Sequence, residues 1–85
     1  MSLKLSEWNE VCKYAEKVCK DLSDKGYRVE AKPYIVYNND SKGICLFVLD
    51  DYGNIFSSYY TGFHYSLSEI TKAIDEQAIR IMNEC

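Results

Sequence analysis

Residues 22–32 of this 85-residue chain, Leu-Ser-Asp-Lys-Gly-Tyr-Arg-Val-Glu-Ala-Lys, contain the change of hydrophobic period that decides the fold. Up to Leu22, apolar residues recur at spacings of three and four, which is typical of one face of an amphipathic helix. From Tyr27 onward, apolar and charged residues alternate, which is typical of a half-buried strand. Gly26 is expected at the left-handed position that ends a helix, with Leu22 and Tyr27 as the apolar pair of a Schellman ending. The segment therefore predicts a helix followed at once by a strand.

The helix before Gly26 is expected to begin at Ser6, a favoured N-cap residue type. Glu7 and Glu10 follow in its first turn, where the helix dipole favours acidic side chains. The residues predicted to face the core are Trp8, Val11, Cys12, Ala15, Val18, Cys19 and Leu22. The opposite side is charged, so this helix has a single packing face.

Three strands are predicted in the middle of the chain. The first continues through Pro33 to Tyr37, and proline places it at a sheet edge or at a bulge, because proline donates no ladder hydrogen bond. Residues 38–43 have the composition of a turn or loop. A second strand is expected over residues 44–49, a hairpin over 50–54 with Gly53 at positive φ, and a third strand over 55–61. The short connections favour an antiparallel meander with the second strand in the middle.

The second helix has the clearest start signal, because Ser66-Leu67-Ser68-Glu69 is a capping box. Its apolar face consists of Leu67, Ile70, Ile74, Ala78, Ile81 and Met82. Two helices with one apolar stripe each are expected to pack side by side on one face of the sheet. The predicted fold is thus a single α+β domain over residues 1–85, of order αβββα, with a three-stranded antiparallel meander and two helices on one face.

Composition and hydropathy exclude several classes of protein. Hydrophobic residues make up 47% and charged residues 27%, which is typical of a globular domain and not of a disordered chain. The longest apolar run, residues 44–49, is far too short to cross a bilayer, so no membrane partner is expected. The first ten residues lack the apolar core of a signal peptide. We therefore expect the protein in the cytoplasm.

Charge is unevenly distributed along the chain. The net charge is −3, from 13 acidic and 10 basic residues, and no Lys or Arg occurs between Gly43 and Thr71. Binding to nucleic acid requires clustered Lys and Arg that replace counterions on phosphates. The middle of the chain has none, so nucleic acid is not the expected partner.

Cysteine and acidic residues do not form a recognisable metal or redox motif. Cys12 and Cys19 are seven residues apart on one helix, about 10 Å between Cα atoms, which is beyond disulfide reach. No CxxC motif occurs, so no zinc or thioredoxin-type site is expected. Cys12, Cys19 and Cys45 are interpreted as small buried hydrophobic residues. Cys85 at the last position is expected to be open to oxidation between molecules.

His64, the single histidine, is the first candidate for a catalytic residue. A Cys45–His64 pair is conceivable, but Cys45 lies in an apolar strand, which raises a thiol pKa, and no residue that would orient the histidine is apparent. Asp50 and Asp51 fit a hairpin turn, and their segment lacks calcium-loop spacing. Glycine-rich phosphate-binding motifs are absent. The sequence predicts no catalytic residue, no cofactor and no metal, and hence not an enzyme.

The central strand is apolar on both of its faces. Ile44, Leu46 and Val48 point one way, and Cys45, Phe47 and Leu49 point the other, but only one set can face the helices. The second face, together with the acidic hairpin, predicts a protein-binding surface. The predicted partner-binding residues are Phe47, Leu49, Asp50, Asp51, Tyr52, Tyr59 and Tyr60. The alternative is that turn segments or sheet edges fold over this face. A homodimer formed through the face is the simplest version of the hypothesis.

The order αβββα over this length resembles the double-stranded-RNA-binding domain. That family grips phosphates with a lysine cluster at the start of its second helix. Here the corresponding stretch, residues 66–72, contains one lysine, Lys72, and an acidic residue, Glu69. The resemblance implies nucleic-acid binding as the alternative function.

In size, acidity and lack of a catalytic motif the chain is also similar to small phage-encoded inhibitors, anti-CRISPR proteins among them. Such proteins occupy the DNA-binding surface of a nuclease. The resemblance implies that Asp40, Asp50, Asp51 and Glu69 would take the places of phosphates. The preferred hypothesis is a non-enzymatic protein-binding module, which either self-associates or inhibits a nucleic-acid-processing partner.

Overall fold

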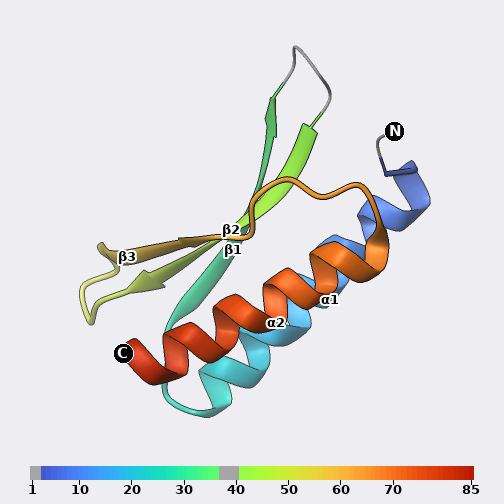
Figure 1. Cartoon of the computed structure of the whole chain (residues 1–85). Coiled ribbons are helices and arrows are strands. Elements are labelled where there is room, and N and C mark those ends of the chain that lie inside the picture. The colour runs from blue at the N-terminus through green and yellow to red at the C-terminus, as the bar shows by residue number, and fades with distance from the viewer. Residues whose placement is uncertain (1–2, 37–40) are drawn as a thin grey trace.

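The computed structural model describes residues 3–36 and 41–85, which form two helices and a three-stranded antiparallel sheet in the predicted order (Figure 1). The elements are α1 (Leu5–Asp24), β1 (Val29–Val36), β2 (Ser41–Leu49), β3 (Ile55–Tyr60) and α2 (Leu67–Glu84). The two helices run side by side in the same direction and cover one face of the sheet (Figure 1). The predicted α+β fold is confirmed.

Local signals account for the end of α1 and the start of α2. Gly26 has a φ of 97°, and the Tyr27 N–H donates to the Leu22 carbonyl at 2.9 Å, which is the predicted Schellman ending. The first strand begins two residues later than expected, at Val29. Ser66 is the N-cap of α2, where its hydroxyl accepts from the Glu69 N–H at 3.2 Å. The Schellman ending and the Ser66 N-cap are confirmed. Of the predicted capping box, the structure has only the bond from the Glu69 N–H to Ser66, and the Glu69 carboxylate lies 3.8 Å from His64 instead.

The predicted N-cap of α1 is wrong. The N-cap is Lys4 and the helix begins at Leu5, so that Ser6 lies inside the first turn. The Lys4 N–H donates to Glu7 Oε1 at 3.1 Å. The reason is that an acidic residue three positions into the helix satisfies this N–H from its own side chain, and no serine hydroxyl is needed at the cap.

The sheet has the order β1-β2-β3, so β2 is central and Pro33 lies in an edge strand as predicted. Ser41–Gly43, expected in a loop, instead belong to β2 and pair with residues 34–36 of β1. The remainder of that expected loop, and Tyr37, lie outside the described residues. Composition was misleading at 41–43 because strand pairing satisfies backbone groups whatever the turn preference of the side chains.

The hydrophobic core lies between the helices and one face of the sheet. Ile44, Leu46 and Val48 of β2 point into it and are 1%, 0% and 5% exposed. The apolar stripes of both helices complete this layer. Tyr27, just after α1, adds a link to α2 through a hydrogen bond from its hydroxyl to the Met82 carbonyl at 3.4 Å. Among the described residues, neither helix is long and apolar enough to cross a membrane.

Candidate functional site

The face of the sheet that the helices leave uncovered carries most of the predicted surface. Cys45, Phe47 and Leu49 of β2 point to this open face, as the alternation of the strand requires. Cys45 is opposite Lys32 of β1 and Tyr60 of β3. Phe47 and Leu49 are half-buried, which is the expected state of apolar residues flanked by neighbouring strands but not capped by a helix.

Three aromatic rings cover one end of the open face. The ring of Tyr34 makes edge-on contacts with Tyr60, at 5.6 Å between centroids, and with Phe63, at 5.1 Å. We call Tyr34, Tyr60 and Phe63 the aromatic cover. Tyr34 lies against Gly43, where a Cβ atom would be only 2.7 Å from its ring. The connection after β3, which contributes Phe63, therefore folds over part of this face, as the alternative hypothesis had it.

Cys45 lies beneath the aromatic cover and is 3% exposed. Burial raises the pKa of the Cys45 thiol, and a hydrogen bond with Tyr60 opposes the rise. The expected direction, a raised thiol pKa in an apolar strand, is confirmed. A thiol in this state is a poor nucleophile.

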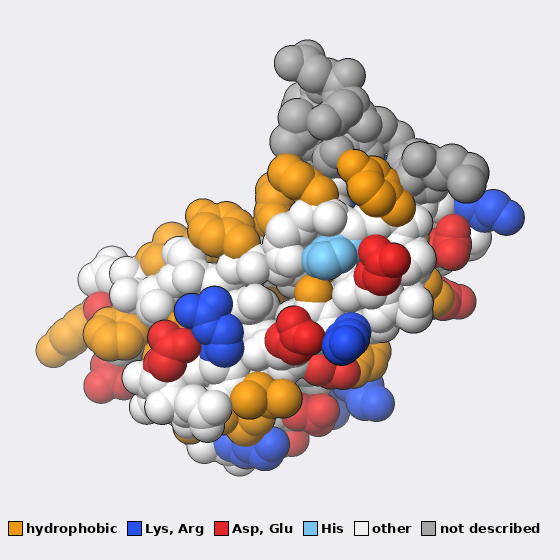
Figure 2. All heavy atoms as spheres, in the orientation of Figure 1, with side chains coloured by type: hydrophobic (Ala, Val, Ile, Leu, Met, Phe, Trp, Pro, Cys, Tyr) orange, Lys and Arg blue, Asp and Glu red, His pale blue; other side chains and the backbone are white. Residues whose placement is uncertain are grey.

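The other end of the open face is bare. The β2–β3 register shifts between Val48 and Leu49, so that Phe56 is an extra residue between the pairs Val48–Ser57 and Leu49–Ile55, as in a β-bulge. Ile55 is 61% exposed and Phe56 is 69% exposed, while Tyr60 at the far end of the same strand is 58% exposed. We call Ile55, Phe56 and Tyr60 the apolar strip. In Figure 2, hydrophobic side chains gather on the sheet side of the molecule and charged ones over α2.

The structure divides the seven predicted partner-binding residues into three groups. Phe47, Leu49 and Tyr60 lie on the open face. Asp50, Asp51 and Tyr52 lie in the turn after β2. The expected place of Tyr59 on the open face is wrong, because Tyr59 pairs with Leu46, faces the helices and is 5% exposed.

Asp50 has a structural role in its turn. Its Oδ1 accepts from the N–H groups of Tyr52 and Asn54, both at 2.9 Å, and Gly53 has the predicted positive φ of 83°. This is the usual use of aspartate at a turn. Tyr52, at the tip, is 89% exposed. Of the acidic pair, Asp51 alone presents an exposed carboxylate that no described residue engages. Asp40 lies outside the described residues.

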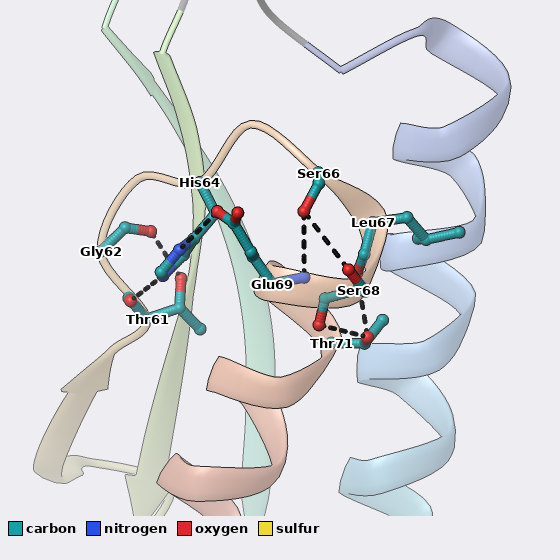
Figure 3. Close-up of polar contacts among 8 residues, drawn as sticks. All are labelled: Thr61, Gly62, His64, Ser66, Leu67, Ser68, Glu69 and Thr71. Carbon is teal, nitrogen blue, oxygen red and sulfur yellow. Dashed lines mark hydrogen bonds and ion pairs between the residues drawn. The ribbon is translucent and has the colours of Figure 1, made fainter.

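A hollow of about 310 Å³ lies beside His64, lined by His64, Glu69, Lys72, Ala73 and Glu76. His64 Nε2 is 2.8 Å from the Thr61 carbonyl, and Nδ1 is 3.8 Å from Glu69 (Figure 3). The histidine ring thus faces Thr61 and Glu69, whereas the Cys45 thiol is hydrogen-bonded to Tyr60. The Cys45–His64 pair that the sequence allowed is therefore not formed. The contact that orients the ring is the hydrogen bond to the Thr61 carbonyl, because 3.8 Å between Nδ1 and Glu69 is too long for a hydrogen bond, and no sequence pattern indicated either contact.

In the part of the chain that the structure describes, no group of three His, Cys, Asp or Glu side chains lies close enough together to hold a metal ion.

The four cysteines are unpaired. Burial raises the pKa of Cys19 to about 11, while Cys85 is exposed with its sulfur 3.5 Å from the Tyr59 hydroxyl.

Three of the residues that shape the open face were not predicted to belong to it. Ile55 and Phe56 were missed because a bulge cannot be read from alternation, and Phe63 because it follows the last strand. The signal that could have found them is the density of aromatic residues after β2.

Compared with protein families and with curated proteins, the chain matches no family and has no significant relative.

Proposed function

We propose that this chain is a non-enzymatic protein-binding module that uses the open face of its sheet. The observation that carries the proposal is the exposure of Ile55 and Phe56, 61% and 69%, at the bare end of the open face beside half-buried Leu49, with Tyr60, 58% exposed, further along the same strand. Large apolar residues that are exposed side by side mark interaction surfaces. The four free cysteines suit a reducing compartment, which supports the cytoplasm as the place where it acts.

The geometry also supports specificity at this surface. The aromatic cover is held by ring-to-ring contacts and by its packing on Gly43, so its rings are ordered before any partner arrives. Pre-ordered aromatic side chains lose little conformational freedom on binding, which is why they dominate binding energy at interfaces. Asp51, exposed at one end of the face, would favour a partner with a basic residue at the rim.

A matched pair of variants tests the proposal. Ile55→Ser removes an apolar side chain from the open face, and Ile79→Ser removes one from α2 that is similarly exposed, at 53%. Immobilised wild-type protein and both variants are compared as baits in an extract, and affinities for a retained protein are then measured with purified material. We expect Ile55→Ser, alone or with Phe56→Ser, to lower affinity at least tenfold and Ile79→Ser to leave it unchanged. Equal affinity for all three baits would refute the use of this face.

The narrower proposal, inhibition of a nucleic-acid-processing protein, depends on acidic groups that replace phosphates. Asp51 supports it, but Oδ1 of Asp50 already accepts from two backbone N–H groups. Asp51→Lys should then abolish binding to a basic partner, whereas Asp50→Asn keeps the Oδ1 acceptor of the turn and should change binding and stability little. Retained binding by Asp51→Lys would exclude this version.

The alternative function, binding of double-stranded RNA, is favoured by the order of elements αβββα alone. The charge at the start of α2 opposes it, because Glu69 lies where a lysine cluster would be needed. Salt-dependent retention on heparin, together with binding to an RNA duplex, would favour it over the protein-binding module.

A further inference from the structure

The two edge strands of the sheet have opposite character. The β1 edge contains Pro33 and the charged residues Glu30 and Lys32, features that natural proteins use to block pairing with another strand. The β3 edge, Ile55–Tyr60, has the sequence Ile-Phe-Ser-Ser-Tyr-Tyr, with no charged residue and no proline. One edge is therefore protected against a further strand, and the other is not.

Backbone groups of β3 are available at this second edge. The Thr61 N–H donates to the Ile44 carbonyl at 3.0 Å, which sets the phase of the β2–β3 ladder. Because only alternate residues of an antiparallel strand bond to a given neighbour, Tyr59 and Ser57 bond to β2. The N–H and C=O groups of Ser58 and Tyr60 consequently point to the free edge.

We propose that β3 pairs antiparallel with β3 of a second copy of this chain, so that two three-stranded sheets join into one of six strands. A two-fold axis at Ser58 places Ser58 opposite Ser58 of the second copy. The same axis places Phe56 opposite Tyr60 of the second copy, and Tyr60 opposite Phe56 of the second copy. A small residue at the centre and an aromatic pair on each side is a favourable cross-strand arrangement.

Charge favours a second copy over an unrelated strand. A two-fold axis brings each residue near its own equivalent, so a charged strand would repel itself, and β3 carries no charge to do so. On the helix side of β3, Arg80 stacks over the Tyr59 ring at 5.3 Å. Arg80 is paired with Glu84 at 3.1 Å, so these two side chains together add no net charge beside β3.

The area at the β3 edge fits a small interface. An aromatic side chain presents about 150–250 Å², so Phe56 and Tyr60, 69% and 58% exposed, offer roughly 190–320 Å² per copy. Pairing in the plane of the sheet covers the flanks of these side chains, and the paired β3 backbones supply the rest of the contact. The interface is therefore smaller than the standard size of about 800 Å² per partner.

This inference rests on the proposed function, because the β3 edge borders the open face and shares Phe56 and Tyr60 with it, and the experiment separates the two. Light scattering after size-exclusion chromatography measures the mass of wild type, Ser58→Lys and the control Ser23→Lys, which adds the same charge on exposed α1. We expect wild type and the control at twice 9.9 kDa, and Ser58→Lys at 9.9 kDa with an unchanged circular dichroism spectrum.

Hydrogen exchange in wild-type protein keeps the test valid if Ser58→Lys does not fold. In the dimer, the amides of Ser58 and Tyr60 should exchange slowly. Dilution to monomer should raise their exchange rates at least tenfold, while the amides of Ser57 and Tyr59 keep their slow exchange. A wild-type monomer at millimolar concentration, or a dimer that Ser58→Lys leaves intact, overturns the inference. A monomer that still loses a foreign partner on Ile55→Ser would overturn the dimer and leave the proposed function standing.

Discussion

Replacing Gly43 by alanine perturbs the point where the open face is most tightly packed. A Cβ atom at this position would lie 2.6 Å from the Gly62 carbonyl oxygen and 2.7 Å from the ring and hydroxyl of Tyr34. Favourable contacts between carbon atoms lie at about 3.5–4.0 Å. The ring of Tyr34 can swing aside, but the Gly62 oxygen is backbone, so the connection between β3 and α2 must move as well.

The expected cost is the balance of two effects. Overpacking of this kind destabilises by about 1–3 kcal/mol, whereas alanine in place of glycine within a strand recovers about 0.5–1 kcal/mol. The net loss of unfolding free energy is therefore roughly 0.5–2 kcal/mol. In a domain of this size the middle of that range lowers Tm by about 5–10 °C.

Thermal unfolding followed by circular dichroism measures the loss, and alkylation mapped by mass spectrometry measures the local effect. Displacement of Tyr34 opens the aromatic cover, so Cys45 should be alkylated faster in Gly43→Ala than in wild type. Gly53→Ala is the control, because its Cβ meets nothing within 4 Å and its cost comes from a φ of 83° alone. If Gly43→Ala is as stable as wild type and Cys45 reacts at the wild-type rate, the close packing described for this face is incorrect.

Three further predictions concern the core, the helix caps and pH. Leu46→Ala removes a side chain that is 0% exposed and should cost about 2–5 kcal/mol in urea unfolding; Leu5→Ala, 72% exposed, should cost much less, and comparable losses would contradict the assigned core. Ser66→Ala should cost about 1 kcal/mol by loss of its cap bond, whereas Ser6→Ala should be nearly neutral, and the reverse order would restore Ser6 as the cap. The Cys19 thiol ionises at about 11 when folded against 9.0 ordinarily, so the unfolded chain releases its proton first as pH rises. Stability should therefore fall as pH rises from 9.0 to about 11, and Cys19→Ala should lessen that fall; an unchanged slope in urea titrations would argue against burial of this thiol.

Much of the fold was predictable because the relevant signals are local. The Gly26 ending and the Ser66 cap each depend on residues within one turn of helix, and both were predicted correctly. The N-cap of α1 and the structure of residues 41–43 were predicted wrongly, and the reason is the same for both. A nearby group, the Glu7 carboxylate or the β1 backbone, satisfied backbone hydrogen bonds that composition had assigned elsewhere.

The sequence by itself determined that the chain forms two amphipathic helices and three strands, and that β2 is apolar on both faces, because periodicity is written in the residues. It also determined that Tyr59 and Tyr60 point to opposite faces. Only the tertiary structure decided which of them is exposed, since that depends on Tyr59 pairing with Leu46 and Tyr60 with Cys45. The tertiary structure also decided two further features, the β-bulge that exposes Phe56 and the packing of Phe63 on Tyr34. Both depend on contacts between separate segments and not on the order of residues within one segment.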